Sequence, residues 1–119
     1  MKKVMVVDDS PFMRQLLTDR LTSYGIEVVA EASDGTKVIP QYKDYHPDIV
    51  LMDVTMPGMS GSQAVKKLLE HDPAAKVIMC SASGQMYLVK ESIHIGAKDF
   101  VIKPFFDNLI STVHEVGQT

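Results

Sequence analysis

Five short apolar runs recur along the chain, and longer segments with helical spacing of apolar residues lie between them. A run of apolar residues without polar alternation is typical of a strand that is buried on both faces, as in a parallel sheet. The alternation of such runs with helices predicts an α/β fold, a doubly wound (βα)5 arrangement with a five-stranded parallel sheet. The runs lie at residues 4–7, 27–32, 49–52, 77–80 and 100–102.

Capping and helix-breaking residues set the expected helix boundaries. The first helix should begin at Pro11, with Ser10 as its N-cap, and continue to Gly25. The second, at about 35–45, contains Pro40, whose missing amide hydrogen costs roughly 3 kcal/mol in a helix interior. We therefore predict that this helix is distorted or starts late, leaving Pro40 in its first turn. The remaining helices are expected at about 61–71, 85–95 and 107–116.

The helix expected at 85–95 carries more apolar positions than one core-facing side requires. Its two apolar stripes are Leu88 with Ile95, and Met86 with Val89 and Ile93. One stripe should face the sheet. The other either packs under a neighbouring loop or forms an exposed contact surface, and the pattern alone leaves both open.

Composition limits the class of protein. The 119 residues are expected to form one domain, 1–119, and no apolar run approaches the roughly 20 residues that a membrane span needs. The start leads directly into a strand without the pattern of a secretory signal. A net charge of −3, with no basic cluster larger than a pair such as Lys66 and Lys67, argues against a nucleic-acid partner. The single cysteine, Cys80, lies in an apolar run and should be buried and reduced, which favours a cytoplasmic location.

Polar side chains follow four of the predicted strands. Asp8 and Asp9 end the first strand and Asp53 ends the third, while Ser81 follows the fourth and Lys103 the fifth. In open parallel α/β sheets, ligands bind at the carboxyl ends of the strands. If the strand order is the flavodoxin-like 2-1-3-4-5, the first and third strands are neighbours and the three carboxylates converge.

This set of side chains suits phosphoryl transfer. Carboxylates a few ångströms apart repel one another unless a cation joins them, and Mg²⁺ prefers such oxygen ligands. Lys103 and Ser81 can reach the oxygens of a phosphoryl group centred on Asp53, which would be the nucleophile that forms an acyl phosphate. Singly, each residue also fits a helix cap, a turn or a solvated strand end. The agreement of four strand ends favours a common site.

These residues lie in four stretches that resemble the receiver domain of two-component response regulators. The similarity is greatest to single-domain chemotaxis regulators of the CheY type, and it spans essentially the whole chain. It implies a flavodoxin-like fold with strand order 2-1-3-4-5 and a cis peptide bond between Lys103 and Pro104. The stretches are VVDDS at 6–10, DIVLMDVTMPGMSG at 48–61, CSA at 80–82 and KDFVIKPF at 98–105.

The resemblance assigns roles at the strand ends. It implies that Asp53 is the phosphoacceptor and that Mg²⁺ binds directly to Asp9, Asp53 and the Thr55 carbonyl, with Asp8 assisting through water. It also implies that Thr55 and Ser83 flank the path of the hydrolytic water and tune the lifetime of the phosphorylated state. The side chains that would contact the phosphoryl group are Ser81 and Lys103.

The resemblance also implies a switch and an output surface. Phe100 matches the aromatic switch position, where chemotaxis members often carry tyrosine, and Ser81 stands where they often carry threonine. The expected partner surface comprises the fourth helix, the fifth strand and the fifth helix. Its candidate contact residues are Val89, Ile93 and Phe100. On phosphorylation, Ser81 is expected to draw its loop toward the phosphate and to open space for Phe100 to rotate inward.

The implied partners are proteins. A histidine kinase would be the phosphodonor, because the four histidines of this chain lie in loop or helix contexts without the partner residues of a kinase. A flagellar switch protein or another protein would be the target, a phosphatase is a further candidate partner, and the chain is expected to be a monomer. It is expected to be a signalling domain that catalyses only its own phosphotransfer and dephosphorylation. A phosphorelay intermediate and a stand-alone adaptor remain open as alternatives.

Two other classes of protein carry a similar set of side chains. A haloacid-dehalogenase-type phosphatase would carry its nucleophile on the first strand in an Asp-x-Asp pattern, whereas Asp8 and Asp9 are adjacent. A flavodoxin-like electron carrier needs a Ser/Thr/Gly-rich phosphate loop after the first strand, where two carboxylates would repel phosphate. Both are therefore disfavoured.

Overall fold

The computed structural model describes residues 2–103 and 106–118. Its centre is a five-stranded parallel sheet with the order β2-β1-β3-β4-β5, so the predicted fold class and strand order are confirmed. The strands are β1 (Lys3–Val7), β2 (Glu27–Ala32), β3 (Ile49–Asp53), β4 (Val77–Ser81) and β5 (Asp99–Ile102). The helices are α1 (Pro11–Thr22), α2 (Val38–Tyr45), α3 (Gly61–His71), α4 (Met86–Ile95) and α5 (Leu109–Gly117). The bond to Pro104, expected to be cis, lies outside the described residues.

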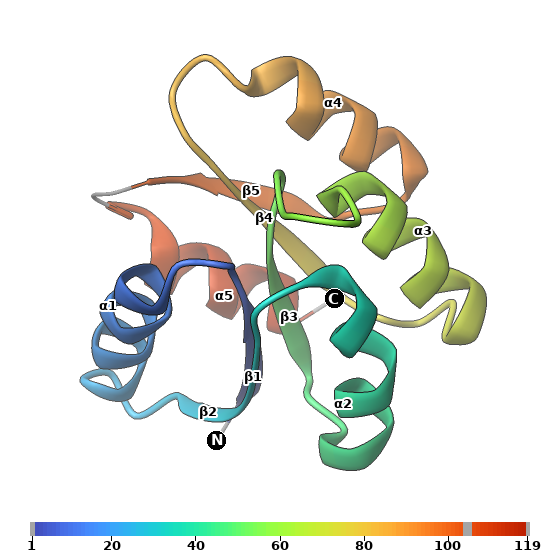
Figure 1. Cartoon of the computed structure of the whole chain (residues 1–119). Coiled ribbons are helices and arrows are strands. Elements are labelled where there is room, and N and C mark those ends of the chain that lie inside the picture. The colour runs from blue at the N-terminus through green and yellow to red at the C-terminus, as the bar shows by residue number, and fades with distance from the viewer. Residues whose placement is uncertain (1, 104–105, 119) are drawn as a thin grey trace.

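Helices cover both faces of the sheet. Helices α1 and α5 pack on one face and α2, α3 and α4 on the other (Figure 1). Alternate residues of each central strand enter different core clusters, so Val4 and Val6 pack with α1 and α5, whereas Met5 and Val7 pack with α2, α3 and α4. Burial on both faces explains why these strands are unbroken apolar runs. Within the described part of the chain, no helix combines the length and apolar character that crossing a membrane requires.

Helix α1 begins where expected and ends earlier. Pro11 is its first residue, and the Ser10 hydroxyl caps it by accepting a hydrogen bond from the Met13 amide at 3.2 Å. The helix ends at Thr22, three residues before the predicted end at Gly25. The reason is a tighter turn, in which the Gly25 amide donates to the Thr22 carbonyl at 3.0 Å.

Helix α2 confirms the predicted late start. A short 3₁₀ turn, Gly35–Lys37, precedes it, and the α-helix itself begins at Val38. Pro40 is then the third helical residue. Its missing amide hydrogen falls in the first turn, where the amide would have no partner within the helix.

The structure corrects one assignment in α4. Val89 is 1% exposed and belongs to the core, with Leu88 and Ile95 packed against the same cluster. The prediction that Val89 lies on an exposed contact surface is therefore wrong. The reason is that Ser92, one helical turn beyond Val89, also occupies a buried position, so the core-facing side includes a polar residue that the apolar pattern did not count. The exposed apolar residues of α4 are Met86, Tyr87 and Ile93.

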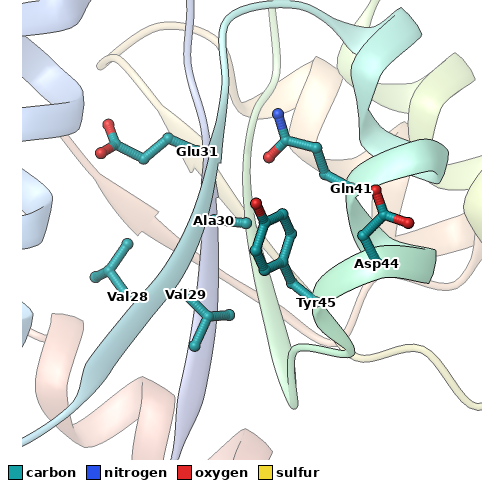
Figure 2. A pocket seen from close by; sticks show the side chains of 7 residues that line it. All are labelled: Val28, Val29, Ala30, Glu31, Gln41, Asp44 and Tyr45. Atoms are coloured by element: carbon teal, nitrogen blue, oxygen red, sulfur yellow. The ribbon is translucent and has the colours of Figure 1, made fainter.

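Strands β2 and β5 form the two edges of the sheet. In β2, Val28 pairs with Val4 and Ala30 pairs with Met5, so Val29 is an extra residue that shifts the register. An open hollow of about 510 Å³ lies between this strand and α2, with Gln41, Asp44 and Tyr45 on its helical side (Figure 2). None of the residues lining this hollow is a predicted site residue.

Candidate functional site

The sheet brings the predicted polar residues to one edge. Asp8 directly follows β1 and Asp53 is the last residue of β3, and these two strands are hydrogen-bonded neighbours. Ser81 is the last residue of β4, and the Lys103 amide donates to the Ser81 carbonyl at 2.8 Å, which extends the pairing of β4 with β5. Four strand ends therefore meet in one acidic pocket, which we define by Asp8, Asp9, Asp53, Ser81 and Lys103.

Lys103 joins two buried carboxylates of the acidic pocket. Its Nζ lies 3.0 Å from Asp53 Oδ1 and 3.5 Å from Asp8 Oδ2. The Asp8 and Asp53 side chains are almost fully buried. With Asp9 included, three carboxylates face one ammonium, so these four groups carry a net charge of −2 when all are ionised. A divalent cation would neutralise that excess.

The donor set of the acidic pocket fits such a cation. One carboxylate oxygen from each of Asp8, Asp9 and Asp53 lies within 4.8 Å of the others. Asp8 Oδ2 is buried and accepts no hydrogen bond from the described residues, although Lys103 is near it. Carboxylate oxygens of this kind are ligands that Mg²⁺ prefers. The Thr55 amide lies 3.4 Å from Asp53 Oδ1, and the role of its carbonyl as a ligand stays a prediction.

Burial changes the proton affinity of these groups. Burial raises the pKa of the Asp53 carboxyl above its ordinary value, the charge of Asp8 raises it further, and the contacts with Lys103 and Thr55 oppose the shift. For Lys103, burial lowers the pKa, but the hydrogen bond and charge of Asp53 outweigh it and raise the pKa overall. Lys103 therefore stays protonated, and its single positive charge does not balance the three carboxylates of the acidic pocket.

Ser81 supplies a buried hydroxyl to the acidic pocket. Its side chain is fully buried, and its Oγ has no hydrogen bond within residues 2–103 and 106–118. A buried hydroxyl without a partner is costly, so it favours an oxygen-rich group nearby. Because Asp53 pairs in register with Cys80, the residue before Ser81, this hydroxyl lies on the strand next to the Asp53 carboxylate.

Cys80 itself is buried and unpaired, as predicted, and burial raises the pKa of its thiol.

The loop after β3 is held close to Asp53 by a glycine. Gly61, the first residue of α3, packs its backbone against the Asp53 carbonyl and Val54. A Cβ at position 61 would lie 2.8 Å from the Val54 Cα, closer than atoms pack. The Ser60 hydroxyl caps the helix by accepting from the Gln63 amide. The PGMSG segment is thus a tight connection that fixes the end of β3.

The predicted output residues lie on a different part of the molecule. A groove of about 530 Å³ runs between α4 and β5. Ile93 is exposed along it, Phe100 is half-buried against the core, and Val89 contributes only from the buried side. Thr55 and Ser83, the predicted lifetime residues, are both exposed and lie two residues beyond Asp53 and Ser81.

Sequence reasoning missed Arg14. Its Nη1 donates to the Asp8 carbonyl at 2.7 Å, and its Nε lies 3.2 Å from Glu31 Oε1. Nothing in the residue pattern signals this contact, because an arginine in an amphipathic helix resembles any solvated side chain. Only the packing of α1 against the end of β1 shows that it reaches the acidic pocket.

Comparison with known proteins gives a consistent result. The family described as the response regulator receiver domain matches residues 4–114. The chain is 51% identical over 104 residues to the chemotaxis protein CheY of Thermotoga maritima, covering 87% of each chain, and 48% identical over 103 residues to that of Bacillus subtilis, covering 87% of this chain and 86% of the relative. It superposes with a TM-score of 0.89 on a chain of the CheX–CheY–BeF3–Mg²⁺ complex from Borrelia burgdorferi, at 38% identity, covering 97% of this chain and 88% of the other.

Proposed function

Because this chain belongs to the response regulator receiver domain family, we propose that Asp53 is its phosphoacceptor and that a histidine kinase is its phosphodonor. The observation that carries the assignment is the position of Asp53, a buried carboxylate at the end of β3 that contacts Lys103 at 3.0 Å inside the acidic pocket. The chain is a signalling domain. We propose that it catalyses only its own phosphorylation and dephosphorylation.

The proposed transfer forms one bond and breaks one bond. An Asp53 carboxylate oxygen attacks the phosphorus of a phosphohistidine, the P–N bond breaks, and the imidazole nitrogen keeps the electron pair and later takes a proton. Lys103 pairs with the phosphoryl oxygens, and the Ser81 hydroxyl donates to another of them. Asp8, Asp9 and Asp53 would hold Mg²⁺, with the Thr55 carbonyl as a further proposed ligand. The metal would supply the remaining positive charge for the transferring group.

We further propose that the output is a protein contact in chemotaxis. The relatives support this proposal, because two chemotaxis proteins CheY are about half identical to this chain over most of its length. The proposed target is a flagellar switch protein. A relative bound to CheX supports a further partner protein besides the kinase, and a phosphatase stays the candidate for that partner. A phosphorelay or adaptor role is the alternative, and a pull-down with the phosphorylated protein would distinguish them.

We further propose that this chain is one monomeric domain in the cytoplasm. Residues 1–119 act as one receiver domain, which the single sheet with helices on both faces supports. The domain works as a monomer. A cytoplasmic location is supported by the buried, unpaired Cys80, since a reduced thiol is usual in that compartment.

Phosphorylation of the Asp53→Asn variant tests the central assignment. Incubation with acetyl phosphate and Mg²⁺ should label the wild-type protein and leave Asp53→Asn unlabelled, because the amide lacks the nucleophilic oxygen charge. Chelation of Mg²⁺ should also abolish wild-type labelling, since the carboxylates would then repel the phosphoryl group. An Asp48→Asn variant, altered at an exposed aspartate before the same strand, is the control and should label normally. Normal labelling of Asp53→Asn, or of wild type in chelator, would refute the assignment.

A further inference from the structure

Arg14 connects helix α1 to the backbone of the acidic pocket. Its Nη1 donates to the Asp8 carbonyl oxygen at 2.7 Å, and its side chain is only 19% exposed. The Arg14 amide donates to the Ser10 carbonyl at 3.0 Å, so the residue belongs to the first hydrogen-bonded turn of α1. The guanidinium therefore reaches back from the helix to the peptide bond that joins Asp8 to Asp9.

The Asp8–Asp9 peptide bond determines the position of the Asp9 Cα, from which the Asp9 side chain extends. The Asp9 carboxylate is exposed, and within the described residues no hydrogen bond or ion pair holds it. Asp8, by contrast, is fixed by its amide, which donates to the Ala32 carbonyl at 3.0 Å, and by its carboxylate, which accepts from the Ser10 amide at 2.9 Å. Because a peptide group is planar, a contact that fixes the Asp8 carbonyl also fixes the direction in which the chain enters Asp9.

A second contact holds Arg14 itself. Glu31, on the edge strand β2, lies 3.2 Å from the Arg14 Nε through its Oε1. In Figure 2 the Glu31 side chain leans away from Gln41, Asp44 and Tyr45 of α2, toward the side of α1. Guanidinium donors stand in a fixed planar fork, so one arginine can contact Glu31 and the Asp8 carbonyl together, whereas a lysine is a single point charge.

From these contacts we infer that Arg14, supported by Glu31, is a positioning residue that orients the Asp8–Asp9 peptide for divalent-cation binding. The inference rests on the proposed function, because it takes these carboxylates to be the cation ligands. A residue that hydrogen-bonds to a metal-ligating residue fixes the orientation of that ligand. Removing such a residue typically lowers metal affinity by roughly 10- to 100-fold. The structure thus extends the acidic pocket to a helix residue and an edge-strand residue.

If Arg14 acted only as a positive charge near the acidic pocket, its removal would change Mg²⁺ affinity in the opposite direction. A nearby cation repels Mg²⁺, so removing its charge would tighten Mg²⁺ binding. If Arg14 acts by positioning, removing it weakens Mg²⁺ binding despite that electrostatic gain. A lysine keeps the charge and loses the fork, so Arg14→Lys separates geometry from charge.

The test is calorimetric titration of MgCl₂ into the metal-free protein. Arg14→Gln should bind Mg²⁺ at least about tenfold more weakly than wild type, and Arg14→Lys roughly threefold more weakly. Arg20→Gln, the same change six residues further along the same helix, is the matched control and should bind as wild type. Urea unfolding in chelator reports stability separately. In the metal-free protein, the NMR signal of the Asp9 amide should shift in Arg14→Lys and stay in place in Arg20→Gln.

Each outcome decides a distinct point. Unchanged or tighter Mg²⁺ binding by folded Arg14→Gln would overturn the inference alone. If Arg14→Gln does not fold, Arg14→Lys decides, and wild-type affinity in that variant would overturn the inference. Failure of the wild-type protein to bind Mg²⁺ would instead overturn the proposed function, and the inference with it.

Discussion

Lys103 has two roles that a single substitution can separate. Its ammonium pairs with Asp53 and Asp8, but it cannot ligate a metal ion. Lys103→Ala should therefore keep Mg²⁺ affinity within about tenfold, or roughly 1.4 kcal/mol, while the protein loses its response to phosphorylation. Calorimetry measures the first effect, and NMR shifts of α4 and β5 residues after addition of acetyl phosphate measure the second. Lys66→Ala, at an exposed lysine of α3, is the control. Lost metal binding with an intact response would reverse the assignment.

Thr55 and Ser83 should set how long the phosphorylated state lasts. Both residues are exposed, two positions beyond Asp53 and Ser81, and neither is an acid or an amide that orients water strongly. We expect slow self-dephosphorylation, and we expect Thr55→Asn or Ser83→Glu to change the rate. Loss of label after removal of the phosphodonor measures it, with the exposed Ser111→Glu as a control for added charge. Unchanged decay in both variants would argue against the role.

The residues of the site differ in how far sequence could predict them. Asp8, Asp53, Ser81 and Lys103 could be predicted to converge, because each ends a recognisable strand and parallel strands end at the same edge of the sheet. Arg14 could not, because its contact is to a carbonyl oxygen and depends on how α1 packs. The roles of Ser83 and the Thr55 carbonyl rest on the family resemblance and stay predictions.

Among the helices, α2 and α3 are joined by a contact that should depend on pH. The Tyr42 hydroxyl donates to Asp72 Oδ2 at 2.6 Å, and this hydrogen bond lowers the pKa of the Asp72 carboxyl, with the Ala74 amide adding to the shift. A pKa lowered by folding stabilises the protein fully above the unfolded value, about 3.9, and the stabilisation is lost as pH falls through the folded value.

Tyr42→Phe should therefore lower the free energy of unfolding by about 1 kcal/mol at pH 7, and the difference from wild type should shrink as the solution is acidified below about pH 4. Urea unfolding at a series of pH values measures it. Tyr45→Phe, at an exposed tyrosine of the same helix, should have little effect at any pH. A Tyr42→Phe deficit that is constant with pH would show that Asp72 is not the partner that matters.

The starts of α1 and α2 followed from sequence because Pro11 and Pro40 decide them locally, whereas the end of α1 and the orientation of α4 did not. Pro40 requires a place in the first turn, and the late start of α2 is confirmed for that local reason. The core-facing side of α4 was misassigned because Ser92 is buried among apolar residues. The burial of a polar residue depends on tertiary packing, because the elements packed around it decide whether its side chain is exposed.

For the molecule as a whole, signal output is proposed to leave through the groove between α4 and β5. The correction for Val89 makes Ile93 the appropriate test, since Ile93 is 40% exposed and Val89→Asp would place a charge in the core. Ile93→Asp should leave Asp53 phosphorylation intact and weaken binding of the phosphorylated protein to a flagellar switch peptide, by about tenfold if Ile93 is a central contact. Fluorescence anisotropy of the labelled peptide measures the affinity.

The control for Ile93→Asp is Tyr24→Asp, which adds the same charge at an exposed apolar residue after α1. It should bind the peptide as wild type does. Normal peptide binding by Ile93→Asp would place the output surface elsewhere on the molecule. Loss of the fold in that variant would mean that Ile93 contributes to the core.

The extra residue in β2 has a consequence for the protein at high concentration. An exposed strand edge is a template on which another chain can add a strand, the first step of many aggregation reactions. Val29 interrupts the regular spacing of β2, and the opposite edge, β5, is only four residues long. Neither edge offers a long, regular row of backbone groups, so a crowded solution of this protein should resist fibre formation through its sheet.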